Sequence, residues 1–511
     1  MEKIIKGVKN MSKSISNKKI AIFCSLFFIA FLISFLSSIN VFSKDIPYTD
    51  SSVFLTIGKG MNEGLTPYKD FFDHKGPLIY FINAFGWSLG KLTGVWVLEI
   101  FFLFATVIFL FKTSEILVPN RPFFSILMTF FSLVPLIVFF EGGNFTEEYA
   151  MSFISLTLYY FTKYYYKHEN LKIWEIVLIG ASFAGTLLLR PNMIAAWIVF
   201  CLAIVLKEVL EKKYKRILAF AILFIFGMLI VILPAMIYLL VRGAFVDFIQ
   251  QFFIFNSRYA SNGGWEVVGN NLLMILDNKY VSLLLLGLSL IVAFYKTKEK
   301  SFYISILLAV ILSIFIIAYS QDNYLHYYLI LVPYFLIPIT VLGVVFLEKL
   351  STTKQWIEYV YLFVLLFVLC ISTLIAGKNI VVSTYHSNEE SGRIAAGELI
   401  KSKTQKNDKI TVVGNSSVMY LYSDRESVSK YIYQSTLKMG SPAAVEEYKN
   451  DVLKNKPQAV VFTLSGNQAM IDGKQDNNSD YYNFFPDLLA KDYEEPIQVS
   501  NYMIYFKKKI S

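Results

Sequence analysis

Charged residues are scarce in this chain, and this absence excludes the ordinary soluble classes of protein. Only 17% of the 511 residues are Asp, Glu, Lys or Arg, while 55% are hydrophobic and 17% are aromatic. Apolar runs of about 20 residues, the length that a helix needs to cross a bilayer, recur along the sequence. Soluble domains do not carry such runs, so the chain is predicted to be a polytopic α-helical membrane protein.

Cysteine is also rare, with three residues in the whole chain. Cys24, Cys201 and Cys370 all lie inside apolar runs, where a thiol behaves as a small core residue. The sequence therefore predicts neither a disulfide framework nor a metal cluster. The motifs HExxH and CxxC do not occur either, so zinc chemistry has no support and no metal site is expected.

The net charge of +9 would suggest a nucleic-acid partner if the protein were soluble. Here the basic residues fall mostly in short loops between apolar runs, which is the pattern that orients a membrane protein, and no nucleic acid is expected. Residues 1–19 carry six lysines and are predicted to be cytoplasmic. The first apolar run, Ile20–Phe42, lacks a cleavage site and is too long for a signal peptide, so it is expected to remain as a helix.

Length and loop charge together predict about 11 spans in the plasma membrane, with the C-terminal tail outside. Pro77–Gly90 is apolar but only about 14 residues long, so it is predicted to lie in the outer interface. The predicted spans are Ile20–Phe42, Val95–Leu117, Phe123–Phe140, a helix following Tyr149, Trp174–Leu189, Ile194–Leu206, Ile217–Leu240, Tyr280–Phe294, Phe302–Tyr319, Leu325–Phe346 and Trp356–Ala376.

Residues 20–376 thus form a predicted transmembrane domain, whose first outer loop with its interfacial helices covers residues 44–94. From about Asn379 the composition changes to that of a small α/β domain, so residues 377–511 are predicted to fold as an extracytoplasmic domain of about 130 residues. Its expected elements are the buried strands Lys409–Asn415 and Pro457–Leu464, the helices Ser416–Tyr422 and Ala443–Asn455, and an edge strand at Tyr502–Lys508.

The segment Asp45–Lys75 is the polar feature that most needs an explanation. It places several carboxylates, Lys69, His74 and Lys75 at the edge of the bilayer, with Asp50 just past the first apolar run. Charges at a membrane boundary cost free energy unless they bind something, which favours a functional site. The alternative is a solvated loop whose charges keep it out of the lipid.

Topology places further polar residues on the same outer side of the membrane, namely Glu147, Glu148, Arg190, Arg258, Tyr259, His326 and Tyr327. Several cations beside several carboxylates suit a substrate that has a phosphate and a hydroxyl to be deprotonated. Cations neutralise the phosphate, and a carboxylate serves as the base.

Several of the residues on this side also have a structural alternative. Asp50 could cap a short helix, and one of the two adjacent glutamates could serve only as a partner of the next helix dipole. Arg190 precedes a proline at a break in an apolar run, where either a bound anion or a paired carboxylate is expected. His326 could be a packed interfacial residue as well as a ligand.

The order and sidedness of these motifs resemble the GT-C glycosyltransferases, specifically the superfamily of protein O-mannosyltransferases and lipid A aminoarabinose transferases. The resemblance covers about the first 350 residues. The matching features are Asp50 after the first helix, PYKDFFDHKGPLIYF at residues 67–81, the acidic pair Glu147 and Glu148, the Arg190-Pro191-Asn192 break, and the HYYL string that leads to Pro333.

The resemblance implies a membrane glycosyltransferase that takes a sugar from a polyprenyl-phosphate donor on the outer face and transfers it with inversion to an envelope glycan, lipid or protein. It implies Asp50 as the general base, with Lys75 and Arg190 on the donor phosphate. No bound cofactor is implied, although some branches use a divalent cation. The expected catalytic residues are Asp50, Glu147 and Glu148, and the expected substrate-binding residues are His74, Lys75, Arg190, Arg258, His326 and Tyr327.

Two other functions are weighed against this one. A transporter or flippase of lipid-linked sugars would carry ionisable residues at mid-span and an internal repeat, whereas the predicted spans are nearly free of charge and Glu99 is the main exception. A glycan polymerase or ligase typically has arginine-rich outer loops. The one large outer loop here, Arg242–Asn271, offers only Arg242 and Arg258.

Overall fold

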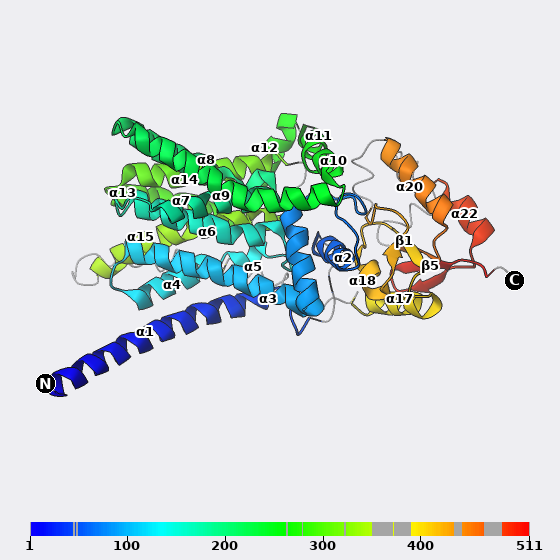
Figure 1. Cartoon of the computed structure of the whole chain (residues 1–511), viewed down its shortest axis with the longest axis horizontal. Helices are drawn as coiled ribbons and strands as arrows, with labels where there is room; N and C mark the ends of the chain where they lie inside the picture. Colours follow the sequence, from blue (N-terminus) through cyan, green and yellow to red (C-terminus); the bar gives the residue numbers. More distant parts are fainter. Residues whose placement is uncertain are drawn as a thin grey trace.

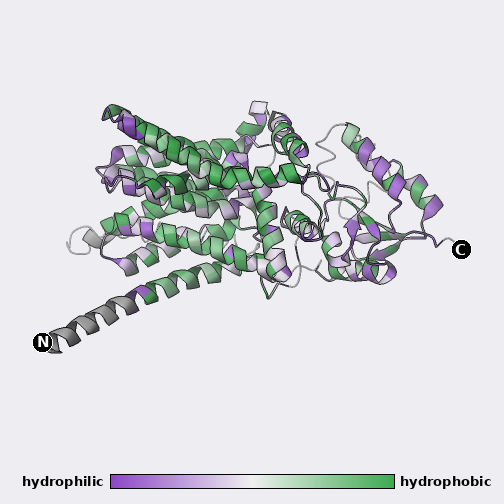
Figure 2. Ribbon diagram, viewed as in Figure 1, coloured by the Kyte–Doolittle hydropathy of each residue, from purple (hydrophilic) through white to green (hydrophobic). Residues whose placement is uncertain are grey.

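The computed structural model describes residues 2–43, 46, 50–261, 264–277, 280–320, 323–349, 371, 390–433, 442–463 and 483–509. They form an elongated molecule in which a bundle of helices joins a small α/β domain end to end (Figure 1). Hydrophobic residues dominate the bundle, and hydrophilic residues are concentrated in the α/β domain and at the far ends of the helices (Figure 2). This distribution is that of a membrane domain carrying a water-exposed domain.

Six segments of the described residues are long and apolar enough to cross a membrane, which agrees with a multi-pass protein. The predicted number of about 11 spans is not confirmed by this count, and the predicted span Trp356–Ala376 falls outside the described residues. The helical elements of the bundle are α1 (Glu2–Ser34), α3 (Pro77–Leu117), α4 (Pro122–Leu133), α5 (Leu136–Phe139), α6 (Thr146–Tyr165), α7 (Ile173–Leu189), η1 (Pro191–Met193), α8 (Ala195–Leu210), α9 (Tyr214–Val241), α13 (Val281–Lys296), α14 (Lys300–Ala318), η4 (Leu325–Phe335) and α15 (Leu336–Lys349).

Helix α3 combines the predicted interfacial helix and the span that follows it. Its backbone is non-helical at Gly90 and Lys91, where φ is 176° and 54°. The part before this break runs across the end of the bundle, and the part after it runs along the bundle (Figure 1). A proline occupies the first turn, as expected of a residue without a backbone N–H. The backbone thus separates Pro77–Gly90 from Val95–Leu117 at the boundary that the sequence predicts.

Both of the longer predicted outer loops contain helices, which were expected in the first loop but not in the second. The first contains α2 (Asp50–Asn62), in which the ten residues from Ser51 to Gly60 are all buried. It is buried because it lies between α3 and the α/β domain, whose position was not available from the sequence (Figure 1). The second, Arg242–Asn271, contains α10 (Phe245–Phe248), the π-helix η2 (Ile249–Phe255), α11 (Asn256–Ser261) and α12 (Gly264–Met274).

The α/β domain contains a five-stranded sheet with the strand order β2-β1-β3-β5-β4. Strand β1 is parallel to β2 and β3, whereas β5 is antiparallel to β3 and β4. The two predicted buried strands are confirmed as β1 and β3. The elements are α17 (Glu390–Lys403), β1 (Lys409–Val413), α18 (Val418–Ser423), β2 (Glu426–Ser427), α20 (Pro442–Asn455), β3 (Ala459–Thr463), α22 (Phe485–Asp492), β4 (Ile497–Val499) and β5 (Tyr502–Phe506).

The prediction of an edge strand at Tyr502–Lys508 is wrong. Strand β5 lies between β3 and β4, and β4 takes the edge of the sheet. Only three residues long, β4 is too short to give a recognisable pattern of alternation, and Ser500, with φ 50°, turns the chain from β4 into β5. The hairpin was therefore missed, and its second strand was taken for the last in the sheet.

Helices α7 and α9 approach each other through glycine. A Cβ atom at Gly180 would lie 2.0 Å from the carbonyl oxygen of Phe224, and one at Gly227 would lie 2.0 Å from that of Val177. Only a hydrogen side chain permits such contacts, and membrane helices commonly use small residues in this way. The position of α7, which ends just before Arg190, is fixed by this packing.

We expect Gly180→Ala to destabilise the protein by about 1–3 kcal/mol, because the added methyl group would force α7 and α9 apart. Gly287→Ala in α13 is the matched control, since a Cβ there meets no atom within 4 Å. The control should be neutral or stabilising by up to about 1 kcal/mol. Thermal unfolding in detergent measures both variants, and equal midpoints would contradict the close packing.

Candidate active site

The candidate site lies at the end of the bundle that faces the α/β domain, around the loop of residues 63–76 between α2 and α3. Asp50 is the first residue of α2, and Lys75 stands near the end of the loop. The Lys75 Nζ atom lies 3.2 Å from the Asp50 Oδ2 atom, and the two side chains are 6% and 39% exposed. A buried ammonium needs such a partner, because an unpaired charge in this position would be strongly destabilising.

Both Asp50 and Lys75 are charged at neutral pH. Burial raises the pKa of Asp50, but the charge of Lys75, with weaker contributions from His326 and Arg190, outweighs burial and lowers the pKa to about 2. Burial lowers the pKa of Lys75, but Asp50 more than compensates, so that the pKa is raised overall. Asp50 is therefore an anion held by cations, whatever its further role.

His74 gives Lys75 a second partner. Its Nε2 atom lies 3.2 Å from Lys75 Nζ, and its ring packs against Phe255 with 5.5 Å between centroids. Burial first, and then the charge of Lys75, lower the pKa of His74 well below its usual value. A neutral imidazole can accept a hydrogen bond through Nε2, so Lys75 donates to Asp50 and His74 with two of the three N–H groups of its ammonium.

Asp73 is a third acid of this loop, and the sequence analysis did not single it out. It is 3% exposed and accepts hydrogen bonds from the hydroxyl groups of Tyr80 and Tyr433, both at 2.7 Å. Its Oδ1 atom also accepts the backbone N–H of His74 at 2.8 Å. The signal in the sequence was a second Asp in KDFFDHK, but nothing there indicated its partners.

Side chains from the helical segment after α9 hold the backbone of the loop. Gln251 donates from Nε2 to the carbonyl of Tyr68 at 2.7 Å, and Asn256 donates from Nδ2 to that of His74 at 2.8 Å. The Tyr68 hydroxyl in turn donates to the carbonyl of Lys75 at 2.7 Å. The loop is thus shaped by side-chain hydrogen bonds rather than by regular secondary structure.

The glycine of the KGP sequence brings the loop against α7. Its N–H donates to the carbonyl of Leu189 at 3.0 Å, and a Cβ at Gly76 would lie 1.9 Å from the carbonyl oxygen of Leu188. No other residue would permit this contact. Because α7 ends at Leu189, the contact places Lys75 beside the residue that follows, Arg190.

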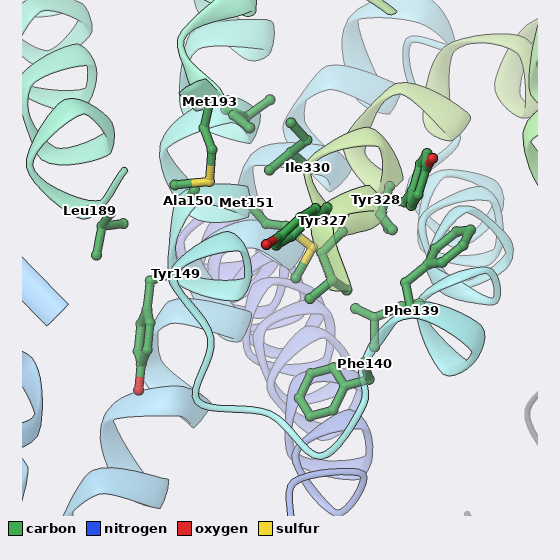
Figure 3. Packing of buried hydrophobic residues seen from close by; sticks show 14 of the residues in the cluster. Phe139, Phe140, Tyr149, Ala150, Met151, Leu189, Met193, Tyr327, Tyr328 and Ile330 are labelled. Atoms are coloured by element: carbon green, nitrogen blue, oxygen red, sulfur yellow. The ribbon is translucent and has the colours of Figure 1, made fainter. Parts of the chain in front are cut away.

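Arg190 is paired with Glu147 deep in the same region. Their Nη1 and Oε1 atoms are 2.6 Å apart, and the side chains are 9% and 3% exposed. The guanidinium lies 4.2 Å from the centre of the Tyr327 ring, a cation–π contact. Of the two expectations for Arg190, the paired carboxylate is present in the structure. Figure 3 shows Tyr327 within the hydrophobic cluster that also contains Met151 and Ile330.

The two adjacent glutamates point to different partners. Whereas Glu147 binds Arg190, Glu148 Oε2 accepts the backbone N–H of Asn144 at 2.7 Å, and Glu99 Oε1 accepts the same N–H at 2.6 Å. Glu99 also accepts the hydroxyl of Ser37 at 2.7 Å. Glu148 therefore belongs to a buried cluster with Glu99, and Glu147 belongs to the cluster of cations.

His326 lies in η4 and is fixed by stacking and by an acid that the sequence analysis missed. Its ring lies parallel to that of Phe145, with 4.1 Å between centroids and an angle of 8°. Its Nδ1 atom is 2.7 Å from Glu141 Oε2, which also accepts the backbone N–H of His326 at 3.0 Å. The side chain of Arg258, in contrast, is exposed on α11, so the structure does not bury it with the other cations.

A polar cavity of about 270 Å³ lies between α2, the loop and the α/β domain. Its walls include Lys59, Lys69 and Lys430 as well as Glu63 and Asp451. Across the described ranges, no group of three or more His, Cys, Asp or Glu residues is placed to hold a metal ion. The cavity therefore offers charges of both signs to a hydrophilic molecule.

Comparison with known proteins places the chain beside one sequence family. Residues 10–376 match the family model described as the putative competence-induced protein Ccs4 N-terminal domain. No curated protein sequence matches the chain.

Solved structures with a similar fold cover both parts of the molecule. ArnT from Cupriavidus metallidurans bound to undecaprenyl phosphate gives a TM-score of 0.58 at 12% identity over 94% of this chain and 97% of that one. Its apo state gives 0.55 at 12% identity over 96% and 98%. The Archaeoglobus fulgidus oligosaccharyltransferase tethered with an acceptor peptide gives 0.54 at 13% identity over 95% and 74%. Both proteins are GT-C glycosyltransferases, so the predicted GT-C fold is confirmed, and identities this low establish the fold alone.

The neutral state of His74 should make the stability of the protein depend on pH. The unfolded chain binds a proton at this residue near pH 6.5, whereas the folded chain does so only at lower pH. Because the unfolded state then binds more protons, stability should fall by up to about 1.4 kcal/mol per pH unit below 6.5. His74→Gln should remove this contribution to the pH dependence of stability, which is measured by thermal unfolding between pH 7 and 5. An unchanged pH dependence would contradict a neutral His74.

Proposed function

The chain belongs to the family of the putative competence-induced protein Ccs4 N-terminal domain, and from this premise we propose that it is a membrane glycosyltransferase. It transfers a sugar, with inversion, from a polyprenyl-phosphate donor to a glycan, lipid or protein of the cell envelope. The reaction takes place on the outer face of the plasma membrane, with the N-terminus cytoplasmic and the α/β domain outside. The observation that carries the proposal is the Asp50–Lys75 ion pair beside Arg190.

The similar structures agree with this kind of donor and acceptor. One of them was solved with undecaprenyl phosphate, a polyprenyl phosphate, and another with a tethered acceptor peptide. Glu99, the one acid that could have favoured transport, accepts hydrogen bonds from Ser37 and Asn144 in a buried cluster. No chain of ionisable groups through the described spans accompanies it, so the charges gather at the boundary, where a transferase needs them.

Lys75 and Arg190 are the proposed ligands of the donor phosphate. Lys75 carries its charge on a compact ammonium, and Arg190 offers a planar fork of N–H groups, so together they suit a phosphate. Both are paired with carboxylates, Lys75 with Asp50 and Arg190 with Glu147. A phosphate carries at least as much negative charge as a carboxylate and can therefore take the place of Asp50 at Lys75.

Asp50 is the proposed general base, and donor binding would prepare it for this role. With the cations around it, its pKa is about 2, which makes a weak base. A phosphate bound at Lys75 would neutralise the cation that does most to lower this pKa. The pKa of Asp50 would then rise towards its usual range, and the carboxylate would be released to take the proton of the acceptor hydroxyl.

Four more of the predicted residues have different places around the site. Glu147 and Tyr327 contact the guanidinium of Arg190 from two sides, and we assign them to holding it in place. His326 is near enough to influence the pKa of Asp50 and is assigned to the donor side of the site. Glu148 is directed to Glu99, so we favour Glu147 as the glutamate that serves the site.

Asp50→Asn should reduce sugar transfer by a factor of about 10² to 10⁴, the range typical of a lost general base. Binding of undecaprenyl phosphate should be retained or tightened, because Lys75 loses the carboxylate that competes for it. Mass spectrometry of envelope glycans from cells with and without the gene first identifies the sugar and the acceptor. Transfer is then measured in membranes supplied with the corresponding polyprenyl-phosphate sugar. Asp487→Asn, which changes an exposed acid of α22, is the matched control, and full activity of Asp50→Asn would refute the assignment.

Lys75→Ala should raise the KM for the donor or abolish its binding, because it removes the cation nearest the proposed phosphate position. Lys491→Ala is the matched control, since this lysine is exposed on α22 of the α/β domain. Titration of both variants with undecaprenyl phosphate gives the comparison. A change confined to the use of the acceptor would show that Lys75 does not bind the phosphate.

A further inference from the structure

The α/β domain reaches into the candidate site through one tyrosine. Tyr433 follows β2, and its hydroxyl donates to Asp73 Oδ1 at 2.7 Å. Asp73 is 3% exposed and stands two residues before Lys75. The hydrogen bond therefore joins the α/β domain to the segment of the loop that carries the proposed phosphate ligand.

Asp73 is held from three directions. Tyr80 of α3 donates its hydroxyl to Oδ2 at 2.7 Å, and Tyr433 supplies the donor for Oδ1. The backbone N–H of His74 also donates to Oδ1, at 2.8 Å, while the N–H of Asp73 itself donates to Gln251 at 3.1 Å. A buried carboxylate needs donors on both oxygens, and here they come from α3, the α/β domain and the loop itself.

The neighbouring residue strengthens the same contact. The backbone N–H of Phe72 donates to the carbonyl of Lys430 at 2.8 Å. The ring of Phe72 stacks on that of Tyr431, with 5.2 Å between centroids and an angle of 26°. Residues 72 and 73 are thus bound to residues 430–433 through backbone, ring and hydroxyl.

We propose that Tyr433 is a positioning residue for the donor site, which anchors Asp73 so that His74 and Lys75 face Asp50. The inference rests on the proposed function, which assigns Lys75 to the phosphate. Lys75 Nζ is 3.2 Å from both Asp50 Oδ2 and His74 Nε2, so a displacement of the loop by about 1 Å would break both contacts. The α/β domain accordingly completes the site rather than only covering it.

The same hydrogen bond influences the charge of Asp73. Burial raises the pKa of Asp73, whereas Lys75, Tyr433 and Tyr80 lower it. Without the Tyr433 hydroxyl the pKa would rise further, so that Asp73 would take up a proton at a higher pH. The titratable groups that face Asp73 are Asp50 from α2, Tyr80 from α3, Tyr433 from the α/β domain, and Tyr68, His74 and Lys75 from the loop.

Tyr433→Phe tests the inference by removing one oxygen atom. The matched control is Tyr493→Phe, because Tyr493 is also buried in the α/β domain but donates to the carbonyl of Pro457, away from the loop. We measure hydrogen–deuterium exchange of residues 68–76 and the affinity for undecaprenyl phosphate as a function of pH. Tyr433→Phe should speed hydrogen–deuterium exchange in the loop and weaken the binding of undecaprenyl phosphate about tenfold. The pH below which this affinity is lost should also move to a higher value.

Asp73→Asn tests the same contact from the other side, because it keeps the shape of the acceptor without its charge. It should weaken binding as Tyr433→Phe does, whether or not the tyrosine variant folds well, and Tyr493→Phe should change none of the three measurements. Unchanged exchange and affinity in Tyr433→Phe, beside a wild-type protein that binds, would overturn this inference alone. Failure of the wild-type protein to bind undecaprenyl phosphate would instead contradict the proposed function.

Discussion

The burial of one ammonium group at the end of the bundle is the constraint on which the rest of the site depends. Lys75 is 6% exposed, and a charge so enclosed requires partners that are already in place when the chain folds. Asp50 supplies the opposite charge, and the neutral ring of His74 supplies a second acceptor. The loop, the start of α2 and the end of α7 must therefore meet at one point. A ligand that replaces one of these partners changes the charge of the whole cluster.

The sequence carried the information for the elements whose pattern is local. The length of α14, the shortness of Pro77–Gly90 and the apolar runs of β1 and β3 were all visible, because burial in lipid or in a sheet imposes a regular apolar pattern over neighbouring residues. Asp50 and Lys75 stood out for a related reason, since charges are rare beside apolar runs. The class of multi-pass membrane protein followed from that contrast.

Contacts between distant parts of the chain carried no such signal. Tyr433 and Asp73 are 360 positions apart, and Glu141 and His326 are 185 apart, so neither pair leaves a local pattern. The burial of α2 depends on the α/β domain that covers it, and the place of β5 depends on a strand of three residues. The sequence thus identified which residues bear charge, while the structure was needed to decide which carboxylate each cation meets.

The glycine contact between α7 and α9 has a consequence for the environment of the site. Helix α7 contacts the loop at Gly76, and the segment after α9 binds the loop through hydrogen bonds from Gln251 and Asn256. Only 6% of the most apolar window of α9 is buried within the protein, so most of this helix faces the lipid. A tilt of α9 would therefore be expected to move α7 and the side chains of Gln251 and Asn256 together, because the same close packing joins the elements that hold the loop.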